Sequence, residues 1–308
     1  MIQDPRLGLI VAPQCFLYDT PGAPEACRGI GPQTDEIFSG WAVSVLESGP
    51  EGWIRIRTHY GYEGWIRGEA LRPLTVEELA ARQDGGRFPL VSDFWMDLHA
   101  EPTVLGDLLI TLPRGSIAER LPVPDREGWI RVRSADGVEG WGQPDALRPR
   151  LDDDSFLLEG GGDRSWFRRR GEAKRKQAAE ADLRAAVVRS ALSRLGTPYR
   201  WGGKSAAGID CSGLAFMAWM ENGFLIWRDA AILPDYPLRP VDRSRLKEAD
   251  LIFFPGHVAV YIGGGRYVHA TAYRKSPRVT VNSLNPADPD YRQDLADSIE
   301  AFGSLFTP

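Results

Sequence analysis

Residues 208–214, with the sequence GIDCSGL, decide how the C-terminal half of this chain is interpreted. Apolar residues follow Cys211 at helical spacing, which predicts that its thiol lies in the first turn of a helix. A helix N-terminus favours a thiolate, and the Cys211 amide is placed to donate to an oxyanion. Gly208 and Gly213 allow other groups to approach closely. The pattern is typical of a cysteine nucleophile.

Two of the four histidines follow on predicted strands. His257 precedes the β-branched and apolar run at 258–262, and His269 lies in the next strand, 266–270, after three glycines. A tight turn between two strands places such side chains side by side. We therefore expect His257 to act as the general base and His269 to orient its imidazole.

Each of these three residues also has a structural interpretation. A buried cysteine is commonly an inert small hydrophobe, and a strand histidine is often a satisfied core residue. One cysteine and two histidines also match a zinc ligand set. The sequence has no close Cys-x-x-Cys or His-x-x-x-His pair, which disfavours zinc. No metal and no organic cofactor is therefore expected.

The nucleophile and histidine motifs resemble those of the NlpC-type cysteine peptidases. The resemblance covers roughly residues 183–303, and it rests on PYRWGG at 198–203, on GIDCSGL, and on the run 246–263 around His257. It implies a papain-like core, with a helix packed on an antiparallel sheet, that cuts bacterial cell-wall peptides. Ala249 departs from the family pattern, which usually has Gly at this turn.

The resemblance also implies residues around the catalytic triad. Tyr199 is implied to line the site and to help hold the oxyanion; packing under the nucleophile helix is the alternative. Asp210 and Ser212 flank the thiol and are implied to bind the substrate, Asp210 as a carboxylate for its ammonium; a helix cap is the alternative for Asp210. Asp229, in an Arg-Asp-Ala turn, is implied to order the site or meet the substrate, with a loop salt bridge as the alternative.

Residues 1–150 contain an internal repeat. EGWIRIR at 51–57 recurs as EGWIRVR at 127–133, and ALRP at 70–73 recurs at 146–149, so that the copies lie 76 residues apart. Alternating strand patterns and glycine-rich turns predict a small β-barrel used twice. The repeated tryptophans are expected in the barrel cores.

The repeats resemble bacterial SH3-type domains. In NlpC-type peptidases with two such barrels, a Tyr and a Glu of the first barrel close the pocket around the free amino end of the substrate. Tyr62 and Glu36 match these residues, and a surface strand aromatic is the alternative for Tyr62. His59 and His99 are expected on the surface rather than as ligands.

Charge, hydropathy and cysteine content limit the cellular compartments and the kinds of binding partner that we expect. The 308 residues carry a formal net charge of −5, which gives no basic footprint for nucleic acid. No apolar run long enough for a membrane span occurs. Residues 1–7 lack a secretory pattern, so Met1 as the natural start predicts a cytoplasmic protein, whereas an upstream signal sequence would predict export. Cys15 and Cys27 have no metal spacing, and the odd cysteine count fits a reducing compartment.

We predict an α+β chain: two small SH3-like β-barrels at 1–75 and 76–150, an exposed linker with solvated charge runs at 151–182, and a papain-like NlpC catalytic domain at 183–308. The resemblance implies hydrolysis of the γ-D-glutamyl–diamino acid bond in murein peptides with a free N-terminal L-Ala, for cell-wall recycling. The expected partner is that peptide, L-Ala-γ-D-Glu-diamino acid. Alternatives are an exported wall hydrolase with wall-binding barrels, an amidase or acyltransferase with the same triad, and a non-catalytic binding protein.

Overall fold

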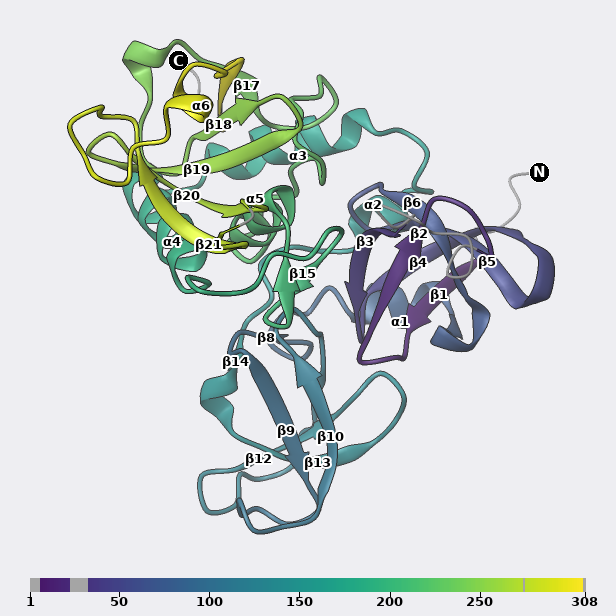
Figure 1. Cartoon of the computed structure of the whole chain (residues 1–308). Helices are drawn as coiled ribbons and strands as arrows, with labels where there is room; N and C mark the ends of the chain where they lie inside the picture. The colour runs from purple at the N-terminus through teal and green to yellow at the C-terminus, as the bar shows by residue number, and fades with distance from the viewer. Residues whose placement is uncertain (1–5, 23–32, 274, 307–308) are drawn as a thin grey trace. The chain divides into compact units, whose positions relative to one another are not determined.

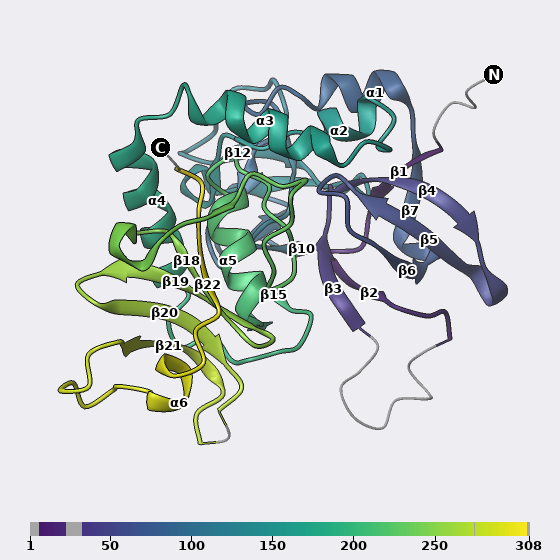
Figure 2. The same ribbon diagram turned by 90° about the horizontal axis from the view of Figure 1, so that it is seen from above.

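The computed structural model describes residues 6–22, 33–273 and 275–306. The chain divides into two compact units, residues 1–162 and residues 163–308 (Figures 1 and 2). Cys27 lies outside the described residues. The predicted α+β class is confirmed: the first unit is rich in strands, and the second combines helices with one larger sheet.

The first repeat forms a seven-stranded sheet in the order β3-β2-β6-β5-β4-β1-β7. All its neighbouring strands are antiparallel. Its strands are β1 (Leu7–Ile10), β2 (Gln14–Tyr18), β3 (Gln33–Phe38), β4 (Ala42–Ser48), β5 (Trp53–Thr58), β6 (Glu63–Arg67) and β7 (Leu71–Leu74). Helix α1 (Val76–Ala81) follows and begins with a capping box between Thr75 and Glu78.

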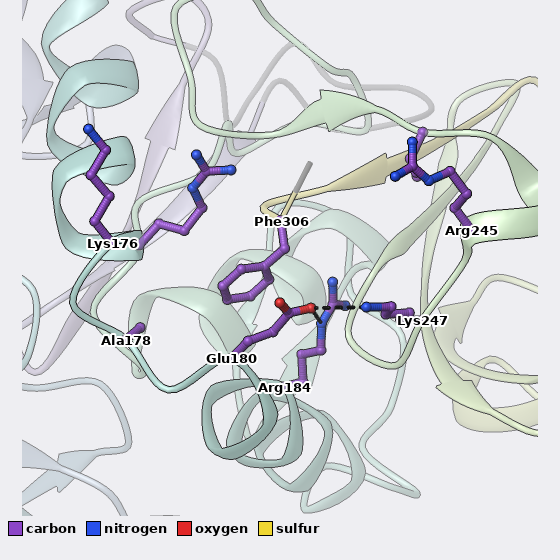
Figure 3. A pocket seen from close by; sticks show the side chains of 9 residues that line it. Lys176, Ala178, Glu180, Arg184, Arg245, Lys247 and Phe306 are labelled. Carbon is purple, nitrogen blue, oxygen red and sulfur yellow. Dashed lines mark hydrogen bonds and ion pairs between the residues drawn. The ribbon is translucent and has the colours of Figure 1, made fainter. Parts of the chain in front are cut away.

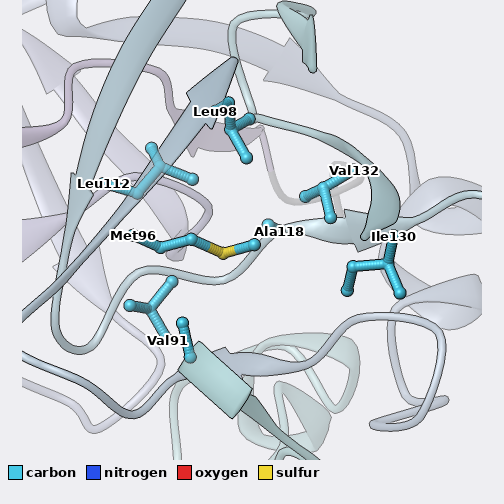
Figure 4. Packing of buried hydrophobic residues seen from close by; sticks show 8 residues of the cluster. Val91, Met96, Leu98, Leu112, Ala118, Ile130 and Val132 are labelled. Carbon is cyan, nitrogen blue, oxygen red and sulfur yellow. The ribbon is translucent and has the colours of Figure 1, made fainter. Parts of the chain in front are cut away.

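The second repeat forms a five-stranded sheet in the order β10-β9-β13-β12-β11, beside the pair β14-β8. Its strands are β8 (Leu90–Val91), β9 (Trp95–His99), β10 (Leu108–Pro113), β11 (Glu119–Arg120), β12 (Ile130–Arg133), β13 (Glu139–Gly142) and β14 (Leu147–Arg148). Figure 4 shows its core, in which aliphatic side chains from these strands and from the adjoining segments pack around Met96.

The two repeats share their turn geometry. Glu51 and Glu127 both have positive φ angles, of 50° and 52°, and each is followed by a glycine that is also positive. A non-glycine residue in this conformation is unusual, so its recurrence at equivalent positions shows that the EGW turn is built in the same way twice.

The expectation for the repeated tryptophans is correct only in part. Trp53 is 1% exposed, but Trp65, Trp129 and Trp141 are only half-buried. The guanidinium of Arg131 lies 5.5 Å from the centre of the Trp141 ring, so this indole is covered by a charged side chain on one face.

Two predictions are wrong. His59 does not lie on the surface, and residues 151–182 do not form an exposed linker. His59 is fully buried, and its Nε2 lies 3.3 Å from Oδ2 of Asp152. Asp152 and Asp154 are also buried, and Arg150 donates to both at 2.8–3.1 Å. Arg150 thus pairs with two buried carboxylates inside the first unit, and helix α2 (Ser155–Leu158) follows directly.

The second unit is built on a six-stranded sheet in the order β17-β22-β18-β19-β20-β21. Its strands are β17 (Arg239–Pro240), β18 (Leu251–Phe254), β19 (His257–Gly263), β20 (Arg266–Thr271), β21 (Arg278–Ser283) and β22 (Ala301–Ser304), with the short pair β15 (Lys204–Ser205) and β16 (Gly208–Ile209) outside the sheet. Its helices are α3 (Ser165–Arg175), α4 (Glu180–Leu192), α5 (Cys211–Met220) and α6 (Gln293–Ala296).

Helix α5 is the central helix of this unit. All ten of its residues are buried, and it packs on β19 and β20, with α4 beside it (Figure 2). The helix that carries the predicted nucleophile is therefore held by contacts with both the sheet and α4.

Among the described residues, no helix combines the length and the apolarity that a membrane crossing requires.

Candidate active site

The predicted nucleophile begins helix α5 because Asp210 caps the helix. The carboxylate of Asp210 accepts from the amide of Gly213 at 2.6 Å and from the amide of Gly202 at 2.8 Å. A Cβ at Gly213 would lie 2.4 Å from the carbonyl oxygen of Gly203, so only glycine fits there. This packing leaves Cys211 6% exposed in the first turn.

Arg228 completes the support of the nucleophile turn, and the sequence did not assign it a role. Its guanidinium donates to both carboxylate oxygens of Asp210, at 3.1 and 2.9 Å, and to Oγ of Ser212 at 2.8 Å. Arg228 is 1% exposed. Asp210 and Ser212 are thus held on either side of the thiol by one buried cation.

The two predicted histidines lie side by side, as the tight turn at residues 263–265 led us to expect. Nε2 of His257 lies 2.7 Å from Nδ1 of His269. Nε2 of His269 lies 2.9 Å from Oδ1 of Asn282 on β21, a residue that the sequence analysis missed. Asn282 in turn donates from Nδ2 to the main-chain carbonyl of Asp290 at 2.6 Å.

This pairing also bears on the zinc alternative. Because the two nearest ring nitrogens of His257 and His269 face each other, they do not converge on a common ligand position. Within the part of the chain that the structure describes, no group of three or more His, Cys, Asp or Glu side chains is placed to hold a metal ion.

The thiol of Cys211 is neutral in this environment. Burial raises the pKa of Cys211 to about 12, and the Asp210 carboxylate adds to this effect. Hydrogen bonds from the amides of Val258 and Ser212, and the charge of Arg228, act in the opposite direction but are outweighed. The amide of Val258 holds the sulfur against β19, the strand that begins at His257. Burial here overrides the thiolate that a helix N-terminus alone would favour.

The imidazoles are neutral as well. Burial lowers the pKa of His257 to about 3, and the neighbouring His269 and Arg292 add to this effect. Burial likewise lowers the pKa of His269 to about 4, although the hydrogen bond with Asn282 acts to raise it. At neutral pH the site therefore combines a neutral thiol with neutral imidazoles.

Tyr199 lies within the electrostatic reach of the thiol. Burial raises its pKa, and Cys211 and Asp210 are the next contributors. Asp229 is exposed, and it is the adjacent Arg228 that contacts Asp210. The structure thus brings Tyr199 to the nucleophile and shows that Arg228 of the Arg-Asp-Ala turn supports it, while the predicted role of Asp229 stays a prediction.

Tyr62 and Glu36 belong to the first unit. Tyr62 is half-buried in the turn between β5 and β6, where its amide donates to Oγ1 of Thr58 at 3.0 Å. Glu36 is buried on β3, opposite Phe16 of β2. Their roles toward the substrate stay predictions.

Ala249 explains why the family pattern has glycine at its position. Its φ angle is +69°, in the left-handed region, and its amide donates to the carbonyl of Tyr261 at 2.8 Å. Alanine therefore carries backbone strain in the turn that leads into β18.

A separate pocket of about 590 Å³ opens in the second unit (Figure 3). Basic side chains from α3, α4 and the segment before β18 surround Phe306 there. None of the predicted site residues lines this pocket, so it is distinct from the Cys211 site.

Comparisons with known proteins bear on the family to which this chain belongs. Residues 196–293 match the model of the NlpC/P60 family. "Dipeptidyl-peptidase 6" of Lysinibacillus sphaericus is 36% identical over 280 residues, which cover 88% of this chain and 92% of that protein. "Gamma-D-glutamyl-L-lysine dipeptidyl-peptidase" of Bacillus cereus is 30% identical over 161 residues, 48% of this chain and 47% of that protein.

The fold has a solved counterpart. The crystal structure of an NlpC/P60 family protein from Bacillus cereus covers 96% of this chain and 98% of its own, with a TM-score of 0.69 and 20% sequence identity. The matched motifs, the full-length relative and the fold lead to one conclusion. The chain belongs to the NlpC/P60 family, whose members are cysteine-type peptidases related to peptidoglycan.

Proposed function

We propose that this chain is a cysteine endopeptidase that hydrolyses the γ-D-glutamyl–diamino acid bond of murein peptides with a free N-terminal L-Ala. The observation that carries the proposal is the thiol of Cys211 in the first turn of α5, which accepts from the amide of Val258 on the strand that also carries His257 of the pair His257–His269. The name of the Bacillus cereus relative supports the choice of bond.

The reaction follows from the protonation states of the site. Both the thiol and the His257 imidazole are neutral, so the proton of Cys211 passes to His257 as the sulfur attacks the γ-carbonyl of D-Glu. The C–N bond then breaks, and the leaving amine takes that proton from His257. A thioester between Cys211 and the L-Ala-D-Glu acyl group remains, and a water molecule activated by His257 hydrolyses it.

The tetrahedral oxyanion needs donors next to the sulfur. The first amides of a helix have no acceptor within the helix, so the amide of Cys211 is suited to this role. Tyr199 is the proposed second donor, because its raised pKa keeps the phenol protonated and able to donate. Tyr199→Phe is expected to lower kcat with little change in KM.

The ammonium of the substrate needs a different partner from Asp210. The Asp210 carboxylate already accepts from the amides of Gly202 and Gly213 and from both terminal nitrogens of Arg228. We therefore assign it to the support of the nucleophile. For the ammonium we propose Tyr62 and Glu36, as the resemblance implies, with Tyr62→Phe and Glu36→Gln expected to raise KM.

A free amino end occurs in peptides already released from the wall, which is why we propose a role in recycling such fragments, in the cytoplasm. The test is mass spectrometry of L-Ala-γ-D-Glu-diaminopimelate incubated with the enzyme, beside its N-acetylated form. Release of L-Ala-D-Glu from the free peptide alone supports the proposal. Equal cleavage of both forms removes the requirement for an ammonium and favours a hydrolase of intact wall.

Two cysteine variants control this experiment. Cys211→Ala is expected to abolish cleavage. Cys15→Ala is the matched control, because Cys15 is another free thiol, located on β2 of the first unit, and its loss is expected to leave cleavage unchanged. Activity that survives in Cys211→Ala would overturn the assignment of the nucleophile.

A further inference from the structure

We infer that Asn282, held by the main-chain carbonyl of Asp290, is a positioning residue that fixes which nitrogen of each imidazole carries the proton. The inference rests on the proposed function, because it concerns how His257 becomes a base. It adds a fourth and a fifth group to the chain that begins at Cys211.

The carbonyl of Asp290 can only accept a hydrogen bond, and it sets the orientation of its neighbour. The amide group of Asn282 must turn its NH2 toward this carbonyl, 2.6 Å away. The oxygen of the same amide is then the atom that faces Nε2 of His269, at 2.9 Å. A main-chain group thus settles the orientation of a side-chain amide.

The next two protons follow from this orientation. Because Oδ1 of Asn282 only accepts, Nε2 of His269 must carry a proton and donate it. A neutral imidazole has one N–H, so Nδ1 of His269 is an acceptor, and Nε2 of His257 must donate to it at 2.7 Å. Nδ1 of His257 is left with its lone pair, which is the form that can take the thiol proton.

The register of the sheet explains why Asn282 can reach His269. On β20 and β21, Tyr267 pairs with Asn282 and His269 pairs with Thr280, so the side chains of Asn282 and His269 are diagonal neighbours on one face. Asp290 is held in turn, since its carboxylate accepts from Arg266 at 2.5 Å. The orienting carbonyl is therefore anchored by a residue of β20 itself.

Burial keeps both imidazoles neutral, and the charges around them make smaller contributions of either sign. Arg292 acts against the protonated form of both histidines, and Asp294 acts in favour of protonated His269. Arg292 is fixed by two contacts with Asp294, at 2.8 and 2.5 Å, and lies 4.5 Å from the centre of the Tyr273 ring. With single protons on each ring, their placement is decided by the hydrogen bonds from Asn282 onward.

Removal of the Asn282 side-chain amide is expected to impair proton transfer from the thiol to His257. In Asn282→Leu, Nε2 of His269 has lost its acceptor, so the proton can move to Nδ1 and be donated to His257. The proton of His257 then sits on Nδ1, where it blocks uptake of the thiol proton. We expect kcat to fall about tenfold to a hundredfold with KM unchanged, as for other residues that orient a catalytic group.

Two further variants separate this role from simple packing. Asn282→Asp keeps an acceptor toward His269, so it is expected to keep the proton on Nε2 and to recover most of the kcat lost in Asn282→Leu. Its added charge favours the imidazolium and moves the acid limb of the pH profile upward. Asn285→Leu is the matched control, because Asn285 is an exposed residue of the next loop that contacts Asp288 and Ser283.

The decisive readout is 15N NMR of histidine-labelled protein, which distinguishes N–H from bare nitrogen in each ring. Only four histidines contribute signals, so the spectrum is simple to assign. Nε2–H on both His257 and His269 in the wild type, with the change confined to Asn282→Leu, confirms the inference. A proton on Nδ1 of either ring in the wild type, or unchanged tautomers in a folded Asn282→Leu, overturns it.

This readout needs no substrate. Failure of the wild type to cleave the tripeptide would therefore overturn the proposed function, while the spectra would still decide the role of Asn282. If Asn282→Leu does not fold, the wild-type and Asn282→Asp spectra decide the question alone.

Discussion

Both units of this protein contain buried imidazoles, but the side chains that contact them differ. In the first unit, His59 is fully buried beside Asp152, which also binds the buried Arg150. In the second unit, His257 contacts a second imidazole, His269. The first histidine lies against a buried cluster of one arginine and two aspartates, and the second pairs with another neutral imidazole. Burial alone therefore does not distinguish the two histidines; the chemistry of their partners does.

Replacing each imidazole in turn gives the largest expected difference between the two histidines. His257→Gln is expected to lower kcat/KM by at least about a thousandfold, because the base is lost. His59→Gln is expected to leave kcat/KM of the folded protein unchanged and to cost about 1–3 kcal/mol of stability. Peptide cleavage and denaturant unfolding of both variants check this, and a catalytic defect in His59→Gln without unfolding would contradict it.

The charged cluster can be tested on its own. Asp152→Asn leaves Arg150 short of one buried counter-charge, so the first unit is expected to lose about 3–5 kcal/mol. Asp153→Asn is the matched control, since Asp153 is half-buried rather than buried, and less than about 1 kcal/mol is expected. Hydrogen exchange would localise the loss, and equal effects of the two substitutions would refute the role of the cluster.

The stability of the two units is expected to respond differently to a fall in pH. The folded-state pKa values of His257 and His269, about 3 and about 4, lie below the ordinary value of 6.5, so unfolded chains bind more protons below that pH. Stability of the second unit is expected to decline from pH 6.5 downward, by on the order of 1.4 kcal/mol for each pKa unit by which an imidazole is lowered.

The first unit behaves differently in the same titration. Burial acts to raise the pKa values of Asp152 and Asp154, but Arg150 outweighs it and both values are lowered. Their contribution to stability is therefore present above the ordinary pKa of 3.8 and is lost only below it. Hydrogen exchange from pH 7 to pH 4 should show the second unit weakening first. Loss of protection in both units at the same pH would contradict this order.

The smallest expected effect concerns the turn before β18. Ala249→Gly relieves a positive φ angle and is expected to raise the stability of the second unit by about 0.5–1 kcal/mol without a change in kcat. Ala287→Gly is the matched control, because Ala287 is exposed and has no positive φ angle, so glycine there is expected to lower stability slightly. Thermal unfolding measures both variants, and a loss of stability in Ala249→Gly would show that the strain is absent.

Sequence patterns predicted what is local along the chain. Cys211 at a helix start and His257 beside His269 follow from short motifs and one glycine turn, and the structure places all three as expected. Arg228 and Asn282 were missed because their partners are brought near only by packing and strand register. The sequence did contain a signal for Asn282: it is a polar residue between Val281 and Ser283 on the strand that follows the His269 strand, where it can face the same side of the sheet as His269.

The linker was misjudged for a related reason. Acidic runs are normally solvated, but Arg150 precedes Asp152 and Asp154 by two and four residues, and this spacing allows one buried guanidinium to bind both carboxylates. The repeats predicted strands and turns because their glycines and alternation are explicit in sequence. The burial of His59 depends on contacts with that later segment, which the repeat alone does not contain.

In the free enzyme, a neutral thiol lies beside a neutral base, and the proposed mechanism depends on this. The direct measurement is the rate of alkylation of Cys211 by iodoacetamide from pH 4 to pH 10, with Cys211→Ala to subtract other thiols. Because burial raises the pKa of Cys211 to about 12, the rate should keep rising through pH 9 without a plateau at neutral pH. A plateau between pH 4 and pH 8 would reveal a preformed thiolate–imidazolium pair and would contradict the neutral state of the site.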